Sequence, residues 1–161
     1  RPSIITDVDY ARRQAEKFVS LADVVKASDE DLEWLYPGQD VLDSARKWLA
    51  IGGSEGPAMV VVTRGAAGPW GITAAGEAEV PAPRVDVADT VGAGDSFMAA
   101  LLSGLVDRGL DGAQNRKELR ELPAEGLAEI LAHAARAAAV TVSRPGANPP
   151  SRAELNGGGA E

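Results

Sequence analysis

The hydrophobic and polar positions along the chain change between helical and strand-like spacing. Apolar residues recur every three or four positions over 7–21 and 40–50, which indicates helices with one buried face. The run 58–63 is apolar almost without interruption, as expected for a strand buried on both faces of a parallel sheet. Together these patterns predict helices over 7–21, 28–35, 40–50, 94–106 and 124–143, and strands over 22–26, 58–63, 70–73, 77–81 and 84–87.

The alternation of strands and helices predicts an α/β protein with three layers, a sheet between two layers of helices. We expect one domain over 1–155, a surface insertion over the polar stretch 108–123, and a disordered tail over the glycine-rich 156–161. Ligands of such sheets bind beyond the carboxyl ends of the strands. The glycine-rich turns of this chain follow predicted strands, so we look there for the site.

The composition of the chain argues against several classes of function. The 161 residues are 45% hydrophobic with a net charge of −8, which suits one globular unit and argues against a nucleic-acid partner. The chain has no cysteine, and His133 is its single histidine, so disulfides, thiolate chemistry and a histidine-based zinc site are not expected. No run is long and apolar enough for a membrane span, and we expect a soluble, cytoplasmic protein.

The most informative stretch is the run Asp89 to Phe97, whose sequence is DTVGAGDSF, directly before an apolar helical pattern. A helix that begins there presents unpaired backbone N–H groups and a partial positive charge to an anion. Gly92 and Gly94, which lack Cβ, let a phosphate approach that backbone closely. Asp95 then stands where a carboxylate could accept the proton of an attacking hydroxyl. The alternative is a tight turn in which the aspartate caps the helix.

This run resembles the C-terminal signature of the PfkB (ribokinase-like) family of carbohydrate kinases. A Walker A loop and a dinucleotide fingerprint both lack their required residues here. The resemblance implies a ribokinase-like α/β/α fold, of which this chain would hold only the C-terminal, nucleotide-binding portion. It also implies Asp95 as catalytic base and an anion hole built from the backbone N–H groups of Gly92, Ala93 and Gly94.

Further segments resemble the same family in the same order. Ser28 and Asp31 match its Asn-x-x-Glu segment and would place Mg²⁺ through water, whereas the alternative is a capped surface helix. Thr63, Gly65 and Gly68 match its nucleotide loop and would contact ATP.

The loop that contains Arg144 and Asn148 resembles the one that closes the adenine pocket, which makes Asn148 a nucleotide-binding candidate. By the same resemblance Asp89 and the carbonyl of Val91 would face a monovalent cation such as K⁺, of which the sequence gives no independent sign. The tryptophans lie in apolar patterns and are expected to serve packing.

The set Lys26, Ser28, Asp31, Trp34, Leu35 and Tyr36, with Arg1-Pro2-Ser3 upstream, is most similar to bacterial fructokinases. The implied function is an ATP-dependent sugar kinase that transfers the γ-phosphate to a sugar hydroxyl. Since complete members of the family are about twice as long, the alternative is a truncated or degenerate ATP-binding or interaction module. A portion of the domain would expose an edge of its sheet, and an exposed edge favours association with another chain, so a homodimer is one of the expectations.

Overall fold

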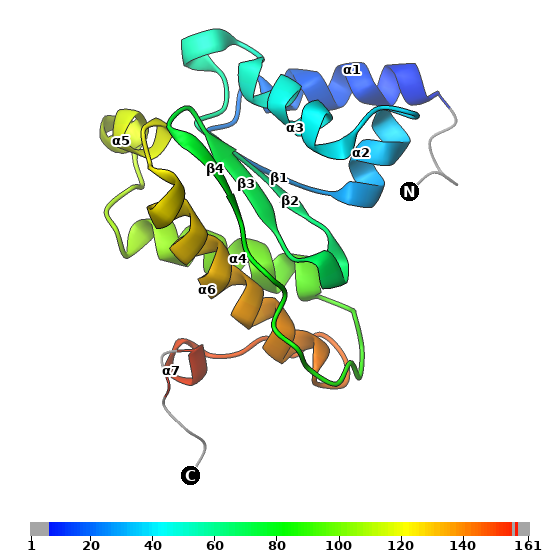
Figure 1. Cartoon of the computed structure of the whole chain (residues 1–161), viewed down its shortest axis with the longest axis vertical. Helices are drawn as coiled ribbons and strands as arrows, with labels where there is room; N and C mark the ends of the chain where they lie inside the picture. Colours follow the sequence, from blue (N-terminus) through cyan, green and yellow to red (C-terminus); the bar gives the residue numbers. More distant parts are fainter. Residues whose placement is uncertain (1–6, 156, 158–161) are drawn as a thin grey trace.

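Helices cover both faces of a mixed four-stranded sheet in the computed structural model, which describes residues 7–155 and 157 (Figure 1). The strands are β1 (Val24–Ser28), β2 (Met59–Thr63), β3 (Trp70–Thr73) and β4 (Gly76–Glu79), in the spatial order β1-β2-β3-β4. The helices are α1 (Val8–Val19), α2 (Asp29–Leu35), α3 (Val41–Ala50), α4 (Ala93–Val106), α5 (Arg116–Arg120), α6 (Ala124–Val142) and α7 (Arg152–Leu155), with 3₁₀ turns η1 (Gly53–Glu55), η2 (Gly65–Ala67) and η3 (Ala113–Asn115). The predicted three-layer α/β/α fold is therefore confirmed.

Strand β2 is the centre of both hydrophobic cores. Val60 and Val62 face the core that β2 shares with α1, α2 and α3, whereas Met59 and Val61 face α4 and α6. All four side chains are fully buried, as the continuous apolar run predicted. Only β1 and β2 are parallel, because β3 and β4 add to the sheet as an antiparallel hairpin. The sheet is thus mixed rather than parallel throughout.

The predicted strand over 84–87 is absent from the structure. Residues 81–87 run as coil, and the backbone N–H groups of Ala88 and Asp89 donate to the carbonyl of Val142 at the end of α6, at 2.8 and 3.2 Å. Arg84 to Val87 has the alternation of a strand, but Pro81 and Pro83 precede it. Proline has no N–H to give to a ladder, so the chain leaves the sheet after β4.

The prediction of a surface insertion over 108–123 is also wrong. Leu119 and Leu122 are only 3% and 9% exposed and belong to the core beneath α4 and α6. Thr73 of β3 donates from Oγ1 to the carbonyl of Leu122 at 2.7 Å, and Arg120 donates to the carbonyl of Pro57 at 2.9 Å. This segment therefore closes one end of the sheet, and its polar composition hides two buried leucines.

The other helices and strands begin and end within a few residues of their predicted bounds. Trp48 and Trp70 are buried, as predicted for packing residues, while Trp34 is half-buried. Apart from Gly157, the predicted tail over 156–161 lies outside the described residues, as do Arg1, Pro2 and Ser3. Within the described part of the chain, none of the helices has the length and hydropathy required to cross a bilayer.

Candidate functional site

The N-terminus of α4 lies close to the carboxyl ends of β1 and β2 and begins at a glycine that no other residue could replace easily. Gly92 has φ of 80°, in the left-handed region, and a Cβ there would lie 3.0 Å from Cβ of Ala147. Its carbonyl accepts the first helical hydrogen bond, from Ser96 at 2.9 Å. The N–H groups of Gly94 and Asp95 precede that bond and have no acceptor within the helix.

The predicted anion hole needs one adjustment. The N–H of Ala93 already donates to the carbonyl of Thr90, at 3.3 Å. A bound phosphate would therefore meet the N–H groups of Gly94 and Asp95 first, and that of Ala93 only in competition with Thr90. Gly92 shapes the turn by its φ and by the contact with Ala147.

A cavity of about 560 Å³ opens on one side of this helix N-terminus, and we call it the large cavity. Four of the predicted site residues line it, namely Thr63 and Gly65 from the end of β2 and Ala93 and Gly94 from α4. Its remaining wall is mainly apolar, with Phe97 of α4, residues 82–85 and 87 of the coil after β4, and one face of α6. The remaining lining residues are Arg64, Ala66, Pro69, Thr90, Ala135, Ala138, Ala139 and Val142.

A second hollow, of about 400 Å³, opens on the other side of Gly94, and we call it the Asp95 hollow. Gly94 lines both spaces, while Asp95 lines only the second. The rest of its wall consists of Phe18, Val19, Ala22, Val24, Val25, Lys26 and Met98. The exposed Asp95 carboxylate is thus separated from the large cavity by one residue of helix.

Lys26 belongs to this site although no site role was predicted for it. It lies on β1, on the side of the sheet that carries α4, and its Nζ would be 3.2 Å from a Cβ built on Gly94. The ammonium group therefore stands at the helix N-terminus. The available signal was a lysine near the carboxyl end of a strand predicted to be parallel, which is where ligands of α/β sheets bind.

Thr63 and the two glycines that follow it take different places. Thr63 pairs with Ser28 in the β1–β2 ladder and reaches the carbonyl of Ala27 with its hydroxyl, at 3.4 Å. Gly65 faces the large cavity, but Gly68 does not. Gly68 has φ of 86°, and a Cβ there would lie 2.1 Å from the carbonyl oxygen of Val80. It is a glycine because the chain passes tightly over residues 80–82.

Ser28 and Asp31 form the capping box of α2. The N–H of Asp31 donates to Oγ of Ser28 at 3.1 Å, and the N–H of Ser28 donates to Oδ2 of Asp31 at 3.2 Å. In the described part of the chain, no three His, Cys, Asp or Glu side chains converge where they could hold a metal ion. Ser28 pairs with Thr63 in the β1–β2 ladder, and the two side chains supply oxygen atoms but no coordination cage of their own.

Asp89 connects the motif to the loop after α6. Its carboxylate accepts from the N–H of Val91 and of Gly146, each at 3.0 Å, and these bonds, that of Val91 first, hold its pKa below the ordinary value. Asn148 and Val91 are exposed and lie outside both hollows, as does Arg144, which pairs with Glu154. The structure therefore brings the 144–148 loop to the motif through Asp89 and Gly92 but does not place Asn148 in the cavity wall.

Comparison with known proteins agrees with this geometry. The family model described as pfkB family carbohydrate kinase matches residues 2–154. The chain is 35% identical over 127 residues to a fructokinase of Rhizobium leguminosarum bv. trifolii, covering 79% of this chain and 37% of that protein. It is 42% identical over 83 residues to the aminoimidazole riboside kinase of Salmonella typhimurium, covering 52% of this chain and 25% of that protein.

Solved structures show the same relationship. A fructokinase with bound ATP from Xylella fastidiosa aligns with a TM-score of 0.74 at 28% identity, covering 91% of this chain and 44% of that one. An aminoimidazole riboside kinase from Salmonella enterica, complexed with aminoimidazole riboside and an ATP analog, aligns with a TM-score of 0.70 at 28% identity, covering 98% and 48%. The chain spans less than half the length of each of these four relatives. The chain belongs to the pfkB family of carbohydrate kinases.

Proposed function

We propose that residues 1–155 are the C-terminal portion of a PfkB kinase domain and supply the ATP site and the phosphoryl-transfer centre of a fructokinase-like sugar kinase. The observation that carries this proposal is the position of Gly94, which lines both the large cavity and the Asp95 hollow. A phosphate bound at the N-terminus of α4 would lie between a nucleotide on one side and an acceptor hydroxyl beside Asp95 on the other.

The large cavity has the properties required for ATP. Its apolar wall, which includes Phe97 and Val142, suits a planar base, and Thr63 adds a hydroxyl to the lining. The phosphates would extend towards Gly94, where N–H groups and the helix dipole favour negative charge. Lys26 would add a full positive charge at the same place. Solved relatives with bound ATP or an ATP analog support the assignment.

Asp95 is the proposed catalytic base. As the sugar hydroxyl oxygen attacks the γ-phosphorus, its proton passes to the Asp95 carboxylate, and the bond from the γ-phosphorus to the bridging oxygen breaks to leave ADP. The N–H groups at the start of α4 would stabilise the negative charge of the transferring group. The exposure of Asp95 on the first turn, where it lines the hollow that a substrate would enter, supports this role.

Mg²⁺ would neutralise the negative charge of the ATP phosphates. Ser28, which pairs with Thr63 in the β1–β2 ladder, and Asp31, its partner in the capping box, would contact it through water. We keep Asp89 and the carbonyl of Val91 as the candidate site for a monovalent cation, K⁺ among them. The Asp89 carboxylate is already held by two backbone N–H donors, so it would reach such an ion only with its remaining lone pairs.

A second candidate is an ATP-binding or interaction module without kinase activity of its own. The Asp95 hollow favours it, because its wall is largely apolar and includes Phe18, which is 70% exposed. Beside it β1 is an edge strand. A sugar needs several polar partners, and among the described residues Lys26 and Asp95 are the only charged groups of that wall.

Calorimetry and a coupled assay on the 161-residue chain separate these candidates. A sugar kinase binds MgATP and forms ADP in proportion to added fructose, whereas the module binds MgATP without fructose-dependent turnover. Asp95→Asn is expected to reduce turnover by about 100-fold or more, the usual contribution of a general base, with MgATP affinity retained. Asp86→Asn, which changes an exposed carboxylate on the coil after β4, is the matched control. Unchanged turnover in Asp95→Asn would rule out Asp95 as the base. Failure to bind MgATP would rule out the sugar kinase and the ATP-binding module, and would leave only the interaction module.

A further inference from the structure

Arg64 connects the turn after β2 to the outer strand of the sheet. Its Nε donates to the carbonyl of Gly68 at 3.1 Å, and its Nη2 donates to Oε1 of Glu79 on β4 at 2.7 Å. The side chain is 17% exposed, so the guanidinium is largely enclosed between the turn and the strand. One planar group thus fixes two elements at once, which a lysine cannot do in the same geometry.

The turn held in this way forms part of the large cavity. Gly65 and Ala66 of η2 line that cavity, and Gly68, with φ of 86°, ends the turn. Within the turn itself, the N–H of Ala67 donates to the carbonyl of Arg64 at 3.0 Å, and the N–H of Gly68 donates to that of Gly65 at 3.2 Å. Both internal bonds are local, and the side chain of Arg64 adds a bond from the turn to β4 beside the tight backbone contact of Gly68 with residues 80–82.

We infer that Arg64 and Glu79 are a positioning pair, which holds the turn Gly65–Gly68 at the distance from α4 that a nucleotide requires. The inference rests on the proposed function, since it takes the large cavity as the ATP site. Glu79 is not in the cavity wall and acts only through Arg64. Loss of its charge therefore tests positioning without removing any group that faces the cavity.

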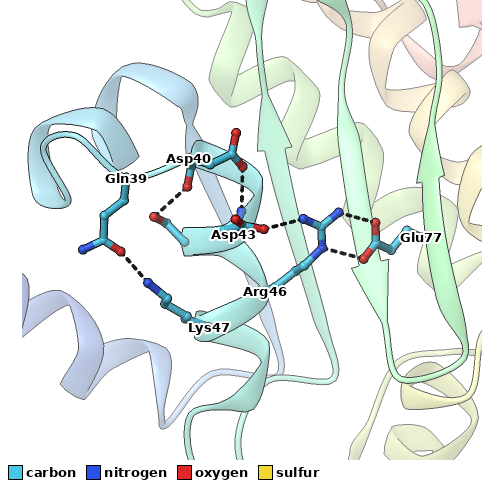
Figure 2. A network of polar contacts seen from close by, with 7 residues as sticks. Gln39, Asp40, Asp43, Arg46, Lys47 and Glu77 are labelled. Carbon is cyan, nitrogen blue, oxygen red and sulfur yellow. Dashed lines mark hydrogen bonds and ion pairs between the residues drawn. The ribbon is translucent and has the colours of Figure 1, made fainter.

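The same strand offers a matched control. Glu77, two residues before Glu79 and on the same face of β4, pairs with Arg46 of α3 through two bonds of 2.7 Å (Figure 2). Arg46 also bonds to Asp43 and lies over the ring of Trp70, 5.3 Å from its centroid. This second pair also joins an arginine to a glutamate of β4, but it has no bond to the turn, and its arginine is more exposed than Arg64, at 41% against 17%.

The experiment compares Glu79→Gln with Glu77→Gln by amide hydrogen exchange and by MgATP calorimetry. Glu79→Gln is expected to speed exchange at Ala67 and Gly68 and to weaken MgATP binding by about threefold, the ratio typical of one partly exposed ion pair. Glu77→Gln is expected to leave both readouts at the wild-type value. Arg64→Lys should behave like Glu79→Gln, and combining the two changes should add little, because both break the same connection.

Two results would overturn the inference. Unchanged exchange at Ala67 and Gly68 in Glu79→Gln would show that the pair does not order the turn. Equal or tighter MgATP binding in Glu79→Gln would show that the pair does not position the turn for a nucleotide. If the wild-type chain does not bind MgATP, the proposed function fails and the role in nucleotide binding fails with it. The exchange measurement then still decides whether Arg64 and Glu79 order the turn.

Discussion

Thr141, near the end of α6, and Ser96, on the first turn of α4, share a buried hydrogen bond of 2.8 Å between their hydroxyl oxygens. Oγ1 of Thr141 also lies 3.0 Å from the carbonyl of Ala137. Because a hydroxyl has one proton, Thr141 donates it to the carbonyl and Ser96 supplies the proton of the shared bond. This bond fixes the start of α4, one residue after Asp95, against the helix that forms the floor of the large cavity.

Replacement of Thr141 by valine keeps the shape of the side chain and removes this bond. We expect the free energy of unfolding to fall by about 1 to 3 kcal/mol, the cost of a buried hydroxyl left without its partner. Thr141→Ser keeps the hydroxyl and should avoid most of that loss, apart from the cost of the missing methyl group. Urea denaturation of the two variants measures the difference, and equal stability of Thr141→Val and wild type would contradict this account of the bond.

Gly92→Ala tests the turn before α4. An alanine at φ of 80° costs about 1 to 2 kcal/mol, and its Cβ would press on Ala147 at 3.0 Å. Gly109 has φ of 66° with no atom within 4 Å of a Cβ, so Gly109→Ala pays the backbone cost alone.

We therefore expect both variants to lose stability in thermal unfolding, and only Gly92→Ala to weaken MgATP binding in calorimetry. If the two alanine variants bound MgATP equally well, the turn at Gly92 would not shape a phosphate site.

Lys26→Met tests the charge at the helix N-terminus. The methionine keeps the length of the side chain and removes the ammonium group that lies near Gly94. We expect MgATP affinity to fall by about tenfold, equivalent to about 1.4 kcal/mol, and adenosine binding to stay unchanged because adenosine carries no phosphate. Lys117→Met, on the exposed face of α5, is the control. A comparable loss for adenosine would place Lys26 in a structural role.

Much of this site could be predicted from sequence, and the failures have physical reasons. The glycines around Ala93 and the apolar run of β2 are local signals, and the structure follows them. Lys26 was missed because its role depends on β1 lying opposite α4, which no local pattern records. The prediction of a strand over 84–87 was wrong because the alternation of apolar and polar residues describes a single segment, whereas a strand needs a second strand to pair with. Pro81 and Pro83 prevent that pairing.

Tyr36 gives a pH dependence of stability. Burial first, and then the hydrogen bond to Glu16 at 2.7 Å, raise the pKa of Tyr36 to about 12. The fold therefore favours the neutral phenol, which also accepts from Nε1 of the buried Trp48 at 2.6 Å. Since the folded pKa exceeds the unfolded value near 10, this contribution is complete below pH 10 and is lost as the pH rises towards 12.

Tyr36→Phe should lower the free energy of unfolding at pH 8 by about 1 to 3 kcal/mol, because Nε1 of Trp48 loses its acceptor. It should also show a smaller further loss between pH 8 and pH 11 than wild type does. Urea denaturation at the two pH values measures both effects. Parallel losses in the two proteins would mean that another group causes the alkaline destabilisation.

The most direct test of the phosphate site is an amide NMR titration of the ¹⁵N-labelled chain with MgATP and, separately, with adenosine. We predict that MgATP shifts the resonances of Gly94 and Asp95 together with those of Gly65 and Ala66, and that adenosine shifts only signals from the apolar wall of the large cavity. Shifts by MgATP that spare Gly94 and Asp95, or that gather instead around the separate hollow lined by Arg108, His133 and Arg136, would contradict a phosphate site at the N-terminus of α4.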